Sequence, residues 1–217
     1  NYNMNYLITA AGKGSRFLKK CIKPPKPLIK VFGNELLIWS MSSFNFKSED
    51  NIYIVTYKHH YVKEKIENKI KKIYPDISIS WLELSEIFNG QLITAIKAIE
   101  FFEIDGPLII HNCDTFHKYP ICNKNFLFKD DLFGIIPCFK AEGENWSFVK
   151  SDSNDPYVAI EVKEKVRISE NCSVGTYVFS SAKNLLLLAK EYLENRDRKL
   201  SEYYIAPIFQ YAIEKKL

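Results

Sequence analysis

The first 115 residues alternate between short β-branched or aromatic runs and segments of helical periodicity, and this alternation limits the folds open to the chain. Strand-like runs are expected at 6–9, 28–32, 51–57, 77–82 and 107–112. Helices are expected at 34–44, with Asn34 as the cap, and at 59–73 and 91–102. Strands that alternate with helices form parallel sheets covered on both faces. We therefore expect an α/β fold with a single Rossmann-like, mixed but mostly parallel sheet.

The second half of the chain is richer in strands. Strand-like runs are expected at 132–140, 147–150, 157–164 and 174–180, and two helices at 182–194 and 202–216. The sequence contains no internal repeat and no low-complexity linker. We expect one domain over 1–217, with halves 1–115 and 116–217.

The loop after the first strand, Ala10-Ala11-Gly12-Lys13-Gly14, has the composition of an anion site. Glycines permit positive φ, and successive N–H groups in such a turn form a concave site for anions. Lys13, Arg16, Lys23 and Lys26 place four cations close to it. A polyanion is the expected ligand; the alternative is an ordinary surface loop with solvated lysines.

Two common phosphate loops are excluded. Residue Gly14 follows Gly12-Lys13, where a Walker A loop needs Ser or Thr, and Phe17 stands where the dinucleotide fingerprint needs a small residue.

Composition argues against several other classes of protein. Only four of the 30 basic residues are arginines, and the lysines are dispersed along the chain, unlike the basic face of a nucleic-acid binder. The five cysteines include no C-x-x-C pair, so neither a disulfide framework nor a zinc site is expected. No apolar run is long enough to span a bilayer. We expect a cytoplasmic protein that binds no nucleic acid and no membrane, with His59 and His60 at the surface and His111 in the core.

The segment 10–17 together with Pro25-Lys26-Pro27-Leu28 resembles the sugar-phosphate nucleotidyltransferases, whose loop reads Gly-x-Gly-Ser/Thr-Arg and is followed by Pro-Lys-Pro-Leu. The resemblance implies transfer of NMP from an NTP to a phosphorylated acceptor, either a sugar 1-phosphate or a small phosphorylated alcohol. The products would be an NDP-linked compound and pyrophosphate, with Mg²⁺ as cofactor. The family's products imply a role in surface polysaccharide assembly, for capsule or lipopolysaccharide.

The resemblance also implies roles for residues of the nucleotide-binding half, 1–115. Arg16 and the segment Ala10 to Gly14 would hold the triphosphate, Lys26 would neutralise charge at the α-phosphate, and Asp114 would bind Mg²⁺. The family has Gly before that aspartate, whereas this chain has Cys113.

The base-contacting glycine of the family maps onto Gly90, at a helix start where free N–H groups attract anions. The base-reading Gln of thymidylyl-transferring members falls near Ser85. The Ala-Ala-Gly-x-Gly-Ser-Arg loop slightly favours CTP.

The acceptor-binding half would be 116–217. Glu164 and Lys165 match the family's Glu-Lys-Pro, with Val166 in place of Pro, and would bind the acceptor's hydroxyls and phosphate. Gly175 matches its Gly-x-Tyr-x-Phe strand, and Trp146-Ser147 replaces its usual Tyr-Gly-Val-Val segment, so a different acceptor pocket is expected.

Several alternatives stay open. The family's second metal-binding aspartate has no counterpart near the end of the sequence, where Asp197 is badly placed; either the protein continues beyond Leu217, or one carboxylate and water hold the metal. A glycosyltransferase would need Asp-x-Asp where this chain has Cys113-Asp114-Thr115. A non-catalytic nucleotide-binding module is the other alternative. The sequence does not decide whether the chain forms a homo-oligomer.

Overall fold

The computed structural model describes residues 3–14, 23–118, 132–195 and 202–217. Within these ranges a central sheet of six strands has the order β5-β4-β1-β6-β12-β7. Its strands are β1 (Asn5–Ala10), β4 (Asn51–Tyr57), β5 (Ile79–Leu84), β6 (Leu108–Asn112), β7 (Gly134–Ile135) and β12 (Thr176–Phe179). The first four are parallel, and β12 runs antiparallel to β6 and β7. The expected mixed, mostly parallel sheet is confirmed.

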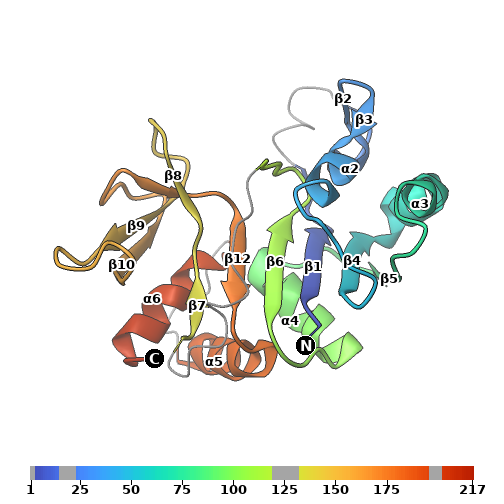
Figure 1. Cartoon of the computed structure of the whole chain (residues 1–217). Coiled ribbons are helices and arrows are strands. Elements are labelled where there is room, and N and C mark those ends of the chain that lie inside the picture. The colour runs from blue at the N-terminus through green and yellow to red at the C-terminus, as the bar shows by residue number, and fades with distance from the viewer. Residues whose placement is uncertain (1–2, 15–22, 119–131, 196–201) are drawn as a thin grey trace.

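Helices cover both faces of this sheet (Figure 1). They are α2 (Leu36–Met41), α3 (Val62–Ile73), α4 (Gln91–Phe102), α5 (Ala182–Glu194) and α6 (Ala206–Glu214). Neighbouring side chains of a strand point to opposite faces. Leu7 therefore joins the core with α4, α5 and α6, whereas Tyr6 and Ile8 join the core with α2 and α3. No helix in the described ranges is long and apolar enough to cross a membrane.

A second, antiparallel sheet stands beside the central one (Figure 1). Its order is β10-β9-β11-β8, with β8 (Cys138–Lys140), β9 (Ser147–Ser151), β10 (Ala159–Glu164) and β11 (Asn171–Ser173). The chain passes between the two sheets at two adjacent points, where the Val174 N–H donates to the Pro137 carbonyl over 3.0 Å. Helix α6 supports β10, because Gln210 Oε1 accepts from the Val162 N–H over 2.8 Å.

Several elements of the structure differ from those expected. The single strand expected at 132–140 is two strands, β7 and β8, in different sheets. Pro137 lies between them and has no N–H to continue a ladder. Strand β11 was not expected. The helix expected at 202–216 begins at Ala206, with Pro207 in its first turn.

The strand expected at 28–32 is replaced by a 3-10 turn η1 (Lys26–Leu28) and a hairpin of β2 (Lys30–Val31) and β3 (Asn34–Glu35). Glu35, not Asn34, precedes α2, and no side chain caps this helix. A second 3-10 turn, η2 (Lys58–His60), precedes α3.

Candidate active site

The loop after β1 and the turn after β6 leave the central sheet side by side. Thr9 pairs with Asn112, so Gly12 and Asp114 emerge at the same carboxyl edge. Gly14 has φ +62, and a Cβ there would lie 3.5 Å from the Cβ of Lys26. The Lys26 ammonium lies 2.7 Å from a carboxylate oxygen of Asp114. The structure thus brings together a glycine turn, a cation and a carboxylate.

Prolines fix the position of Lys26. Pro27 is buried, and the Pro25 carbonyl accepts from the Leu28 N–H over 2.8 Å, which closes η1. Proline removes backbone freedom on both sides of the lysine. Arg16, the other cation expected here, lies outside the described residues.

His111 holds the turn that carries Asp114. Its Nδ1 lies 2.7 Å from Thr176 Oγ1, and its Nε2 lies 3.0 Å from the Thr115 carbonyl. A carbonyl only accepts, so Nε2 carries the hydrogen and Nδ1 accepts from the hydroxyl. Burial, assisted by the nearby His117, lowers the pKa of His111 to about 3. This neutral core histidine, as expected from the sequence, is a structural brace for the turn.

Cys113 occupies the place of the family's glycine. Its side chain is buried in the core shared with α2 and α3, and burial raises the pKa of the thiol to about 12. It is therefore a packed thiol with no thiolate character at neutral pH.

Gln91 joins the ends of β1 and β6, which the sequence did not reveal. Its Nε2 donates to Thr9 Oγ1 over 2.9 Å and to Asn112 Oδ1 over 2.7 Å. Gly175, with φ +88, packs against the same asparagine, because a Cβ there would lie 2.6 Å from Asn112 Nδ2. The only signal in the sequence was the position of Gln91 directly after Gly90.

Gly90 is covered by backbone from the end of the chain. Its φ is +104, and a Cβ there would lie 2.2 Å from the Tyr203 carbonyl oxygen. That carbonyl accepts from the Leu92 N–H over 3.1 Å, so this N–H of the α4 terminus is already bonded. Ser85, the other residue expected at this edge, is exposed just beyond β5.

The expected acceptor residues form a second group, on β9 and β10. The Ser147 hydroxyl donates to the Glu164 carboxylate and lies 3.4 Å from the Tyr177 hydroxyl. Burial raises the pKa of Glu164, although Ser147 and Lys165 favour its charged form. The Lys165 ammonium donates to the Tyr204 hydroxyl and lies 4.2 Å from the centre of that ring.

The side chain of Trp146 contacts Glu142 and Phe139. Its Nε1 donates to the Glu142 carbonyl over 3.0 Å, and its ring meets Phe139 edge-on. The Trp146 carbonyl accepts from the Lys165 N–H over 2.9 Å, so the backbone of Trp146 helps to position Lys165.

Two cavities lie near these groups. The first, of about 340 Å³, lies between the glycine turn, the Pro-rich segment and the residues after β4. His59 and His60, expected at the surface, line it together with Lys65.

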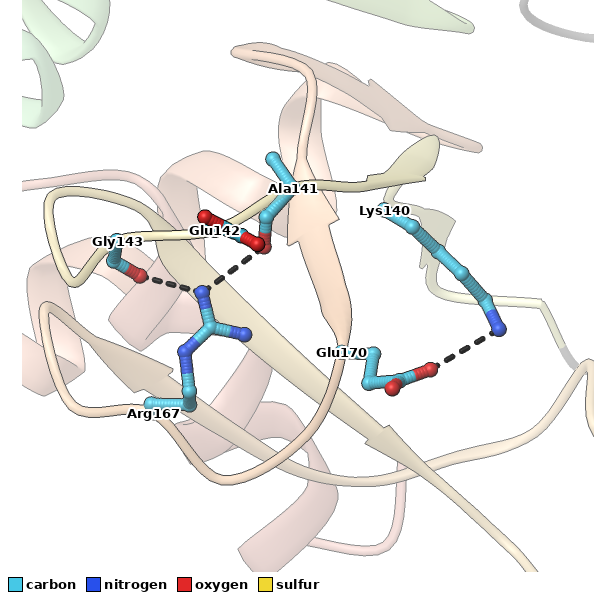
Figure 2. A pocket seen from close by; sticks show the side chains of 6 residues that line it. All are labelled: Lys140, Ala141, Glu142, Gly143, Arg167 and Glu170. Atoms are coloured by element: carbon cyan, nitrogen blue, oxygen red, sulfur yellow. Dashed lines mark hydrogen bonds and ion pairs between the residues drawn. The ribbon is translucent and has the colours of Figure 1, made fainter.

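The second cavity, of about 380 Å³, lies on the small sheet (Figure 2). There the Arg167 guanidinium donates to the carbonyls of Ala141 and Gly143, and it stacks 4.6 Å from the Phe148 ring. These hydrogen bonds hold the segment 141–146 against Arg167.

Proteins of similar sequence and fold are known. No family model matches the chain. Bifunctional protein GlmU of Methanocaldococcus jannaschii is 26% identical over 204 residues, which cover 92% of this chain and 45% of that protein. GlmU of Campylobacter concisus is 24% identical over 221 residues, covering 100% and 47%. The chain thus spans about half the length of the curated relatives it matches.

Solved structures match over nearly the whole chain. The nucleoside-diphosphate-sugar pyrophosphorylase of Vibrio cholerae RC9 has a TM-score of 0.81 and 25% identity, and the match covers 97% of this chain and 88% of that one. The chain is a distant relative of the sugar-phosphate nucleotidyltransferases. The inositol-1-phosphate CTP transferase of T. maritima shares the nucleotidyltransferase fold with a TM-score of 0.74, at 14% identity and with 99% and 83% of the two chains covered.

A magnesium ion fits this nucleotidyltransferase relative with one protein ligand. Asp114 offers a carboxylate whose side chain is 30% exposed at the sheet edge. Mg²⁺ is commonly bound by one or two carboxylates together with substrate phosphates and waters. Across the described ranges, no three His, Cys, Asp or Glu side chains gather as a metal site, so phosphate and water would complete the shell.

Proposed function

We propose that the protein transfers NMP from an NTP to a phosphorylated sugar or small alcohol. The observation that carries the proposal is the Lys26–Asp114 pair, 2.7 Å apart, beside the positive-φ turn at Gly14. It lies at the carboxyl edge of the sheet, where α/β folds bind their ligands. The fold and the relatives described above support the same activity.

In the proposed reaction an oxygen of the acceptor phosphate attacks the α-phosphorus in line. A new P–O bond forms as the bond to the β-phosphate breaks, and pyrophosphate leaves. The protein contributes mainly position and charge. Lys26 neutralises the α-phosphate, the loop amides and Arg16 hold the triphosphate, and Lys165 orients the acceptor phosphate once its ammonium leaves Tyr204.

Magnesium, when bound, would supply further neutralisation of the phosphate charge, and Asp114 would hold it. Glu164 and Ser147, already bonded to each other, offer oxygens to acceptor hydroxyls. We further propose CTP as the nucleotide, because the Gly12-Lys13-Gly14-Ser15-Arg16 loop is similar to that of cytidylyl-transferring members. A role in surface polysaccharide synthesis follows from the resemblance.

The test is a matrix of the four NTPs against phosphorylated sugars and alcohols, with pyrophosphate release as the readout on the full-length protein with Mg²⁺. We expect one NTP and one acceptor class to give sustained release. Transfer of sugar from an NDP-sugar without pyrophosphate would instead indicate a glycosyltransferase. Binding of NTP without release from any combination would indicate a non-catalytic module.

A further inference from the structure

The ammonium of Lys165 is held by a side chain from the segment that precedes α6. It donates to the Tyr204 hydroxyl and lies 4.2 Å from the centre of that ring. The hydroxyl in turn donates to a carboxylate oxygen of Glu202. Because the hydroxyl hydrogen points to the carboxylate, the oxygen keeps its lone pairs for the ammonium. The family resemblance gave no role to Tyr204 or Glu202.

The backbone around Tyr204 is anchored, so Lys165 is the partner that can move. Two backbone hydrogen bonds, of 3.0 and 3.1 Å, hold the preceding residue, Tyr203, at the start of α4. The following residue, Ile205, is buried in the core. Lys165 is exposed, and its ammonium ends a flexible stem of four carbons. A stronger partner would therefore draw the ammonium away from the ring.

The present partner of the ammonium is a neutral one. Within the described ranges, no salt bridge includes Lys165. The phenol is uncharged at neutral pH, because partial burial and the hydrogen bond to Glu202 raise the pKa of Tyr204. Hydrogen bonds between two ionised groups are stronger than those with a neutral partner. A phosphate dianion would thus displace the phenol oxygen.

We propose that Tyr204, oriented by Glu202, is a positioning residue that holds the Lys165 ammonium until the phosphate of the acceptor displaces it. The proposal rests on the proposed function for the identity of that phosphate. Tyr204 acts on the acceptor through Lys165, because each acceptor must break the hydrogen bond between these two residues before it gains the ammonium. The tyrosine hydroxyl therefore lowers the affinity for the acceptor.

The test is calorimetric titration with glucose 1-phosphate and, separately, with glycerol 3-phosphate. Each is added with and without the α,β-methylene analogue of CTP, which cannot be cleaved. Tyr204→Phe removes the hydroxyl and keeps the ring. Tyr211→Phe is the matched control, because Tyr211 also donates to a glutamate, Glu191, over 3.0 Å. The Lys215 ammonium lies 5.3 Å from the centre of the Tyr211 ring, and this group joins α5 to α6 without any acceptor residue.

We expect Tyr204→Phe to bind the phosphate ester about two- to tenfold more tightly, the range for one hydrogen bond that no longer has to be broken. Tyr211→Phe should stay within about twofold of wild type, as for a distant site. In a Lys165→Gln background, Tyr204→Phe should change nothing, because no ammonium is held. Damage to the fold would weaken binding, so it cannot produce the expected gain. Thermal denaturation verifies that each variant is folded.

The proposal is overturned if neither ester binds the wild-type protein, if Tyr204→Phe binds no more tightly than wild type, or if the gain persists without Lys165. These titrations require no turnover. The expected gain in a protein that releases no pyrophosphate with any NTP would refute the proposed function and leave the role of Tyr204 standing. Pyrophosphate release by a protein whose affinity is unchanged in Tyr204→Phe would refute the role of Tyr204 alone.

Discussion

Replacement of Gly90 by alanine is the sharpest test of the close contact between Gly90 and the backbone of Tyr203. Gly90 has φ +104 and ψ 166, a region used almost only by glycine. A Cβ there would lie 2.2 Å from the carbonyl oxygen and 2.5 Å from the nitrogen of Tyr203. Because both atoms are backbone, no side-chain rotation relieves the contact.

The expected loss of stability has two parts. The strained backbone costs about 1–3 kcal/mol. Moving Tyr203 away also breaks its two backbone hydrogen bonds, with Leu92 and Asn89, at 3.1 and 3.0 Å. Each such bond contributes about 1 kcal/mol. We expect Gly90→Ala to lower the free energy of unfolding by about 3–5 kcal/mol, the sum of these terms.

Gly33→Ala is the matched control. Gly33 also has positive φ, +83, but a Cβ there meets nothing within 4 Å. It should therefore lose only the conformational part, about 1–2 kcal/mol. Urea denaturation of both variants measures the difference from the midpoints, provided that the m-values agree. Equal losses in the two variants would show that Tyr203 does not press on Gly90.

Three further predictions follow from the site. Arg16→Ala and Lys26→Ala should each lower pyrophosphate release by about 10²–10³, the usual effect of removing a group that stabilises transition-state charge, and unchanged release in both would refute the assigned site. The pKa of His111 falls from 6.5 to about 3 on folding, so between these pH values the unfolded state binds a proton that the folded state does not. The free energy of unfolding should therefore drop as pH falls from 6.5 towards 3, by up to about 1.4 kcal/mol per pH unit. Urea titrations at several pH values should show a shallower slope for His111→Gln, and an equally steep slope would contradict the assignment. Arg167→Lys should speed hydrogen exchange of the 141–146 amides and raise the acceptor KM severalfold while the NTP KM holds. The guanidinium spreads its donors over three carbonyls, with Nη2 donating to Ala141 and Gly143 and Nη1 to Ser169, and a single ammonium nitrogen cannot reproduce this spacing. Unchanged exchange would contradict this role of Arg167.

Periodicity predicted the elements whose burial pattern is local. The helices expected at 91–102 and 182–194 coincide with α4 and α5, because their apolar faces repeat without interruption. The strand expected at 132–140 was wrong, since its apolar run is divided by Pro137 between two sheets. Strand β11 has only three residues, too few to show a period.

The residues of the candidate site show the same contrast between local patterns and contacts that are distant in sequence. Lys26 and Asp114 follow from a motif and a strand end, and the structure brings them into contact. The contact of the Tyr203 backbone with Gly90 and the hydrogen bond from Gln91 to Thr9 join residues that are far apart in sequence. Such contacts are decided by the packing of helices on the sheet, which no local pattern records.

The paired crossings at Pro137 and Val174 have a mechanical consequence. Two neighbouring connections, bonded to each other over 3.0 Å, join the small sheet to the large one. Helix α6 holds the same sheet at β10, through the hydrogen bond from the Val162 N–H to Gln210 Oε1. A sheet held both at its crossings and at β10 resists sliding and twisting, so we expect acceptors of different size to be accommodated by side-chain changes, with the lateral register of Ser147 and Glu164 preserved.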